Sequence, residues 1–209
     1  MRRWGMATIP LFPLNTVLFP DGRLPLQVFE VRYLDMVKRC IEDGEEFGVV
    51  PLLEGDEVRK PGQQEAIGTV GTLSRIVEWS APMPGLMHIT CLGTQRFRLL
   101  SAGQTKLGLW VGEIERVEDD MAVPVPGEQQ DVADALGSVI RALQQRHVAP
   151  EKMPLQPPYR LDESGWVANR WCELLNIETP QKQLLLAQDN PVLRLELVQD
   201  MLADAGLLS

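Results

Sequence analysis

The chain has 209 residues and 44% hydrophobic content, which is enough for a sizeable core in one large or two small domains. Lys and Arg number 20 against 29 Asp and Glu, and the resulting net charge of -9 opposes binding to nucleic acid or anionic lipid. No apolar run reaches the length of a membrane span, and the three widely spaced cysteines form neither a disulfide framework nor a CxxC pair, which favours a cytoplasmic location.

The first half of the chain is mostly strand-like. Ile9–Leu14 and Leu24–Val28 are apolar but contain prolines, which predicts that each lies at a sheet edge or as an extended entry segment. Short strands at close spacing predict a small twisted sheet or barrel, and Gly68, Gly71 and Gly112 within them predict bulges or close backbone contacts. The other predicted strands are Phe47–Leu53, Ile67–Val77, Leu86–Leu92, Arg96–Leu100 and Leu107–Val117.

One amphipathic helix is predicted to interrupt these strands, between Phe29 and Gly44. Its apolar residues recur every three or four positions, and Gly44 stands where a C-terminal cap belongs. The predicted buried stripe is Val31, Leu34, Val37 and Ile41, with Cys40 beside it. The predicted exposed face carries Arg32, Asp35, Lys38, Arg39, Glu42 and Asp43.

Roughly four helices are predicted in the second half. Apolar stripes over residues 132–143 and 167–175 predict the first two. Thr179-Pro180 and Asn190-Pro191 each place a capping side chain before a proline at the first helical position, which predicts two more. The last helix is expected to bury Leu193, Leu197, Met201 and Leu202, with Gly206 beyond its end.

A change in composition divides the two halves. The strand-like part of the sequence ends at Glu118-Asp119-Asp120, and Val123–Gly127 has the proline-rich composition of a linker. We therefore predict an α+β protein with a β-rich domain at residues 1–120 and an α-helical bundle at residues 121–209.

No pattern for catalysis or metal binding is evident. Gly103 and Gly108 have the spacing of a P-loop but lack the following Lys and Ser/Thr. The chain has only two histidines, and the nearest approach to a metal site pairs His88 with Cys91, which a strand would point to opposite faces. Cys172 lies among apolar residues and is expected to be a buried, inert thiol. We expect no enzyme activity, catalytic residue, metal or cofactor.

Three stretches together resemble one known family, that of the Lon protease N-terminal domain, which includes standalone bacterial members and the related domain of cereblon. They are Ile9–Pro20 continuing to Leu24–Tyr33; Phe47–Val50 with Ile67–Thr69 and Gly93–Arg98; and Gln181–Leu186 followed by Arg194–Glu196. The resemblance implies a PUA-like β pseudo-barrel with one inserted helix, followed by a C-terminal helical bundle. In Lon proteases this region is associated with substrate recognition and with holding the hexamer together.

The resemblance also implies a function. Because the sequence stops at Ser209 without a P-loop, we expect a standalone member that lacks the ATPase and protease domains. The leading hypothesis is a non-catalytic protein that binds exposed apolar segments of other polypeptides. The alternative is an adaptor or assembly factor for one specific protein partner. RNA binding through the PUA-like fold is a third. Arg96-Phe97-Arg98 alternates charged and aromatic residues as an RNA-binding strand does, but the acidic chain favours an ordinary strand there, with Phe97 inward and both arginines outward.

The residues of the first stretch, which carries the resemblance most specifically, supply candidate contact residues. The structural alternative is that its prolines end strand pairing, that Phe29 and Tyr33 anchor the helix on the sheet, and that Glu30 and Arg32 pair or cap locally. Four tryptophans are compatible with either core or interface, and burial would decide between these roles: Trp79, Trp110, Trp166 and Trp171. The peptide-binding candidates are Pro13, Leu14, Phe19, Pro20, Pro25, Phe29 and Tyr33.

Overall fold

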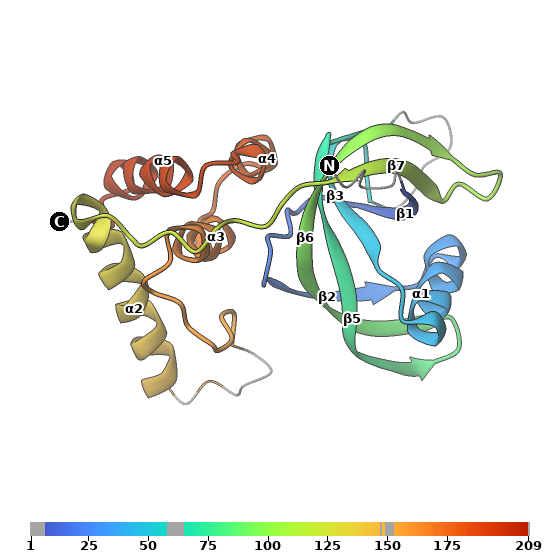
Figure 1. Cartoon of the computed structure of the whole chain (residues 1–209). Coiled ribbons are helices and arrows are strands. Elements are labelled where there is room, and N and C mark those ends of the chain that lie inside the picture. The colour runs from blue at the N-terminus through green and yellow to red at the C-terminus, as the bar shows by residue number, and fades with distance from the viewer. Residues whose placement is uncertain (1–6, 58–64, 147, 149–152, 209) are drawn as a thin grey trace. The chain divides into compact units, whose positions relative to one another are not determined.

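The computed structural model of the chain describes residues 7–57, 65–146, 148 and 153–208 (Figure 1). The chain divides into two compact units. One consists of residues 1–119 together with 178–186, and the other of residues 120–177 together with 187–209. We call them the β-rich unit and the helical unit and describe each by itself.

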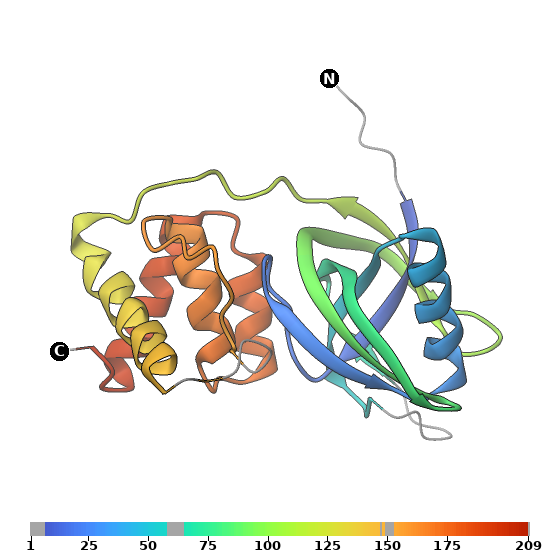
Figure 2. The same cartoon turned by 90° about the horizontal axis from the view of Figure 1, so that it is seen from below.

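The β-rich unit is built on a seven-stranded sheet, in which six strands follow the order β1-β7-β6-β5-β3-β4. Because β1 also pairs with β3, five of these strands close into a barrel, and β2 pairs with β6 outside that ring (Figure 2). The predicted α+β class with a small barrel is confirmed. The strands are β1 Ala7–Leu14, β2 Arg23–Val28, β3 Phe47–Glu54, β4 Ala66–Ile67, β5 Val70–Met83, β6 Leu86–Gln104 and β7 Trp110–Arg116.

The proline-containing strand β1 lies inside the sheet, so its predicted place at an edge was wrong. It changes neighbour at Leu11: residues before this point pair only with β7, and residues after it pair only with β3. Pro10 lies in the first part and Pro13 in the second, so each proline has one unpaired side on which its missing N–H breaks no ladder hydrogen bond. The prediction for β2 is confirmed, since β6 is its only strand neighbour among the described residues.

β5 and β6 form a long ribbon that extends beyond the barrel. Their outer parts, together with β2, make a three-stranded sheet in the order β2-β6-β5. The sequence predicted two strands where β6 is continuous. Gly93 permits this continuity, because a Cβ at that position would collide with the carbonyl oxygen of Phe19. The segment around Phe19 thus passes close to β6 at Gly93 without interrupting the strand.

Helix α1, Val31–Asp43, packs against the three-stranded sheet (Figure 2). Gly44 ends it in the left-handed conformation, with φ of 68° and its N–H donating to the carbonyl of Cys40, as predicted. The predicted stripe was wrong at its first turn, because Val31 is 71% exposed. Arg32, predicted to be exposed, is buried instead: its Nη1 donates to the carbonyl oxygen of Gly108 at 2.7 Å, and Nη2 lies 3.2 Å from Oε2 of Glu30.

Helix α4, Thr179–Ala187, falls within the helical half of the sequence but groups with the β-rich unit. Thr179 Oγ1 donates to the carbonyl of Asn15 at 2.9 Å, and Nη1 of Arg96 donates to the carbonyl of Leu186 at 2.9 Å. Arg96 is therefore buried, although both arginines of its strand were predicted to point outward. The chain leaves the strands, enters the helical unit and returns once, so residues 178–186 depart from the predicted division at residue 120.

The helical unit contains a short 3-10 turn η1, Gly127–Gln129, and the helices α2 Gln130–Gln145, α3 Ser164–Leu174 and α5 Pro191–Asp204. Asn190 caps α5 as predicted, accepting from the N–H groups of Val192 and Leu193. The buried face of α5 differs from the prediction, since Leu193 and Leu197 are partly exposed. Its buried residues are Arg194, Leu195, Val198 and Leu202. None of the described helices is both long and apolar enough to cross a membrane.

Candidate functional site

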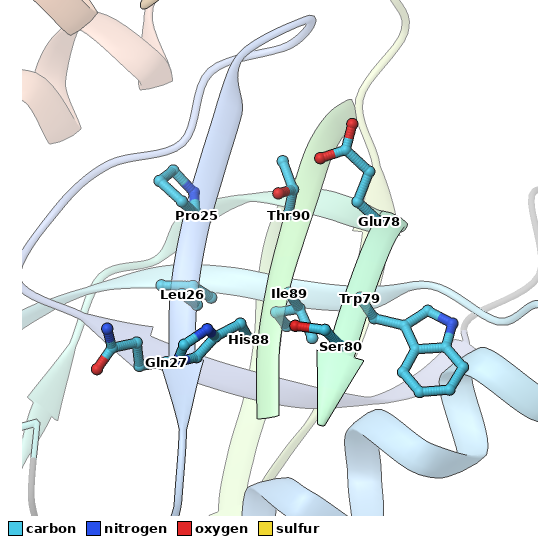
Figure 3. Close-up of a pocket in the computed structure, with 9 residues that line it drawn as sticks. All are labelled: Pro25, Leu26, Gln27, Glu78, Trp79, Ser80, His88, Ile89 and Thr90. Atoms are coloured by element: carbon cyan, nitrogen blue, oxygen red, sulfur yellow. The ribbon is translucent and has the colours of Figure 1, made fainter. Parts of the chain in front are cut away.

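Two hollows adjoin on the three-stranded sheet of the β-rich unit, and Trp79 contributes to both. The first, which we call the polar hollow, has a volume of about 510 Å³. Figure 3 shows its side chains in rows that cross the strands, with Pro25, Thr90 and Glu78 in one row. The complete lining is Pro25, Leu26, Gln27, Glu78, Trp79, Ser80, His88, Ile89 and Thr90.

The second hollow, which we call the apolar groove, lies between α1 and the tip of the β5–β6 ribbon. Its volume is about 660 Å³. Helix α1 contributes Leu34 and Ile41, flanked by Lys38 and Glu42, while the ribbon contributes Trp79 and the continuous segment 81–87. The walls are mostly apolar, which is typical of sites for hydrophobic ligands or side chains.

Trp79 stands out among the four tryptophans that the structure describes. Trp166 and Trp171 are buried, and Trp110 is half-buried, with its Nε1 donating to Oε2 of Glu65 at 2.6 Å. Trp79 is 57% exposed, and Met83 on the same ribbon is 59% exposed. Large apolar side chains left in water beside an apolar groove are characteristic of binding surfaces.

The edge position of Trp79 follows from the strand pairing. Within the part of the chain that the structure describes, only residues 72–74 of β5 pair with β3, and the other paired residues of β5 have partners in β6 alone. The register of β5 against β6 also shifts between Ile76 and Glu78, which marks an irregularity just before Trp79. The ribbon thereby presents Trp79 at its outer edge (Figure 3), where no described strand pairs with β5.

One ion pair fixes the charge on the polar hollow. Nη2 of Arg23 donates to Oε1 of Glu78 at 2.8 Å, across the outer strands of the three-stranded sheet. This hydrogen bond, together with the positive charge of Arg23, lowers the pKa of the Glu78 carboxyl group. The carboxylate of Glu78 on the polar hollow is therefore paired with the positive charge of Arg23.

Comparison with known proteins bears on this architecture. The family model of the ATP-dependent protease La (LON) substrate-binding domain matches residues 8–204. The chain belongs to this family. The resemblance inferred from the three sequence stretches is confirmed, and the chain is a LON substrate-binding domain by fold and sequence.

Curated relatives of this LON domain are Lon proteases. The chain is 28% identical over 206 residues to the Lon protease of Anaeromyxobacter dehalogenans, covering 94% of the chain and 23% of that protein. It is 29% identical over 201 residues to Lon protease 2 of Myxococcus xanthus, covering 93% of the chain and 23% of that protein. The chain thus spans about a quarter of the length of these relatives.

Solved structures agree with this LON fold. The Lon N-terminal domain protein from Xanthomonas campestris superposes with a TM-score of 0.75 at 31% identity, covering 93% of this chain and 98% of that one. The N-terminal domain of a Mycobacterium avium complex Lon protease gives a TM-score of 0.62 at 14% identity, covering 95% and 99% of the two chains. The second likeness concerns the fold alone.

The seven peptide-binding candidates of this LON domain do not form one surface. Pro13, Leu14, Phe19 and Tyr33 are buried, and the ring of Tyr33 stacks on Phe12 with centroids 4.0 Å apart. Burial also raises the pKa of Tyr33. Buried side chains cannot contact a partner in this conformation, so these four act in the core.

The other three candidates have surface available. Pro25 is exposed and lines the polar hollow, and Pro20 is half-buried. Phe29 is 53% exposed, so it does not anchor α1 in the core as the structural alternative supposed, whereas Tyr33 does. Direct contact with a client through Pro20, Pro25 and Phe29 stays a prediction.

The histidine and cysteine side chains that could take part in chemistry are separated in the structure. His88 is exposed and Cys91 is fully buried, so they lie on opposite faces of β6 as the strand geometry predicted. Cys172 is buried, as expected. Across residues 7–57, 65–146, 148 and 153–208, no three His, Cys, Asp or Glu side chains converge in a way that could hold a metal ion.

The sequence did not identify the apolar groove. Residues 81–85 gave only a turn signal, and Trp79 was compatible with either core or interface. A weak signal was present, because Met83 lies within this proline-rich turn and Trp79 lies just before it, and turns lie at the protein surface. The contribution of α1 to the groove depends on tertiary packing and left no mark on the sequence.

Proposed function

We propose that this chain is a non-catalytic polypeptide-binding domain, which captures exposed apolar segments of other proteins in the apolar groove. Membership of a substrate-binding domain family supports a role in substrate recognition. The observation that carries the finer proposal is the exposure of Trp79 and Met83 beside that groove. An apolar client segment would remove both side chains from water.

The energetics suit transient capture. Burial of a large apolar side chain contributes about 1.5–3 kcal/mol when it goes from fully exposed to fully covered. Trp79 and Met83 are each a little more than half exposed, so a client covers only part of each side chain. Tryptophan is also prominent among residues that dominate binding interfaces. We therefore expect Trp79 to be the largest single contributor to client affinity.

The test measures binding of a permanently unfolded protein, such as a reduced and carboxymethylated one carrying a fluorescent label. Anisotropy titration gives the dissociation constant for the wild-type chain and for Trp79→Ala and Met83→Ser. Each substitution is expected to weaken binding by roughly fivefold or more, which corresponds to about 1 kcal/mol.

Matched controls are available in the same chain. Leu107 is 76% exposed and Met121 is 79% exposed, and neither lines the apolar groove. Leu107→Ala and Met121→Ser should leave the dissociation constant unchanged. Equal losses in the groove variants and these controls, or no saturable binding by the wild-type chain, would contradict the proposal. A pull-down that returns one discrete folded partner in place of many clients would favour the adaptor alternative.

A further inference from the structure

The three-stranded sheet has two outer edges, and they differ in what they offer to another strand. β2 carries Pro25 in its centre, paired with Thr90 of β6. Since proline has no N–H, the outer edge of β2 lacks a hydrogen-bond donor at its midpoint. β5 has no proline between Ile76 and Ala81, and within the described residues no strand pairs with its outer edge there. Strand addition is therefore favoured at β5.

The opposite end of β5 already has a two-point hydrogen-bond partner. In the amide orientation that satisfies its bonding, Gln183 of α4 donates to the carbonyl oxygen of Val70 at 3.2 Å and accepts from the N–H of Val70 at 3.1 Å. A side-chain amide thus makes there the pair of hydrogen bonds that a neighbouring strand would make. The outer edge of β5 is therefore occupied at this end, by Gln183 at Val70 and by β3 at residues 72–74.

We propose that a client polypeptide adds to the free edge of β5 as an extra strand, and that Lys38 and Glu42 read the order of its charges. This inference rests on the proposed function, because its occupant is the same client segment. The client is an extended segment with apolar side chains facing the apolar groove, an acidic residue opposite Lys38 and a basic residue opposite Glu42.

The spacing of the two charges supports this assignment. Lys38 and Glu42 are four positions apart on α1, which places them about 6 Å apart along the helix axis. In an extended strand, side chains on the same face are two residues apart, or about 6.8 Å. Both charges are exposed and both line the groove beside Trp79. A client strand that runs alongside α1 can therefore present an acidic and a basic residue, two positions apart, to Lys38 and Glu42 at once.

The test uses peptides of one apolar composition that differ only in charge order or in backbone methylation. The parent has Glu and, two positions later, Lys. The swapped peptide exchanges the two, and the synthesis includes both chain directions so that either strand orientation is sampled. Because exposed ion pairs contribute about 0.2–1 kcal/mol each, one charge order should bind the wild-type chain roughly threefold to tenfold more tightly than the other.

The double variant Lys38→Glu/Glu42→Lys should reverse this preference. Thermal unfolding followed by circular dichroism confirms that the variant is folded. A second series carries N-methyl groups on alternate backbone amides. Methylation of the amides that face β5 should weaken binding by about tenfold, while methylation of the intervening amides should leave it unchanged.

Two distinct failures can be told apart. If peptides bind and depend on Trp79, but both charge orders bind equally in both proteins or both methylation registers have the same effect, strand addition with charge reading is overturned while the proposed function survives. If neither the unfolded protein nor any peptide binds, or if Trp79→Ala binds them as the wild type does, the proposed function fails and this inference fails with it.

Discussion

Arg194 and Asp120 form a two-point ion pair within the helical unit. Nη1 of Arg194 donates to Oδ2 of Asp120 at 2.6 Å, and Nη2 donates to Oδ1 at 3.3 Å. The arginine side chain is fully buried and also donates to Oδ1 of Asn169 at 3.0 Å and to the carbonyl of Gln188. One guanidinium group on α5 therefore contacts the start of the unit, α3 and the segment that precedes α5.

Removal of the carboxylate should destabilise the helical unit strongly. Asp120→Ala leaves the buried Arg194 charge without its main partner, and an uncompensated buried charge costs about 3–5 kcal/mol. Urea unfolding monitored by circular dichroism would measure this loss. Asp119 is exposed and adjacent in sequence, so Asp119→Ala is the control and should change the free energy of unfolding by less than about 0.5 kcal/mol. Similar values for the two variants would contradict the role assigned to Asp120.

Truncation of two consecutive leucines on α4 should change the free energy of unfolding by very different amounts. Leu185 is 1% exposed, and Leu184 is 72% exposed. We expect Leu185→Ala to lower the free energy of unfolding by about 2–5 kcal/mol, because it leaves a cavity in the core. Leu184→Ala should have an effect near zero. Denaturant titration measures both, and a large loss for Leu184→Ala would show that α4 packs with a different face.

A methyl group added to Gly71 should be poorly tolerated. A Cβ built there would lie 2.5 Å from the carbonyl oxygen of Val49 and 2.6 Å from the ring of Phe97, inside the barrel. Gly71→Ala is therefore expected to cost about 1–3 kcal/mol through overpacking. Gly103 has no atom within 4 Å of such a Cβ, so Gly103→Ala is the matched control. The melting temperatures of the two variants, each compared with the wild-type chain, test this prediction. Equal values for Gly71→Ala and Gly103→Ala would exclude tight packing at Gly71.

The buried thiols should make the fold less stable at alkaline pH. Burial raises the pKa of Cys91 to about 12 and that of Cys40 to about 11, from an ordinary value of 9.0. Below pH 9.0 both thiols keep their protons in the folded and unfolded states. Above it the unfolded chain releases protons that the folded chain retains, so the free energy of unfolding falls with rising pH, by up to about 1.4 kcal/mol per pH unit for each thiol.

Urea titrations at several pH values between neutral and alkaline would measure this dependence. The double variant Cys40→Ala/Cys91→Ala should show a shallower fall than the wild-type chain. The remaining slope comes in part from Tyr33, whose pKa burial also raises. An unchanged slope in the double variant would show that the thiols do not cause the effect.

Predictions from the sequence succeeded where the signal was local. The end of α1 at Gly44 and the start of α5 at Asn190 were predicted correctly, because a left-handed glycine and a side-chain cap act within a single turn. Close packing at Gly71 was also predicted correctly from its place within a strand. Such features depend on the residue and its immediate neighbours.

Predictions failed where distant residues decided. Arg32 and Arg96 were expected in solvent. Both are buried, because their guanidinium groups donate hydrogen bonds to backbone carbonyls that are distant in sequence, those of Gly108 and Leu186. β1 was expected at an edge, and it lies inside the sheet because it exchanges one neighbour for another between its two prolines. In each case the missing information was the identity of a partner remote in sequence.

The candidate site also combines features that the sequence encodes locally with features that depend on residues distant in sequence. The sequence by itself determined the α+β class, the LON family, the capped helices and the presence of an apolar, proline-rich N-terminal stretch, because composition, periodicity and short motifs encode these directly. Only the tertiary structure placed Trp79 in solvent and buried Tyr33 and Phe19. Hydrophobicity alone gives all three aromatic residues the same tendency to be buried. Exposure depends on whether another element covers the side chain, and at Trp79 no described strand pairs with that edge of β5.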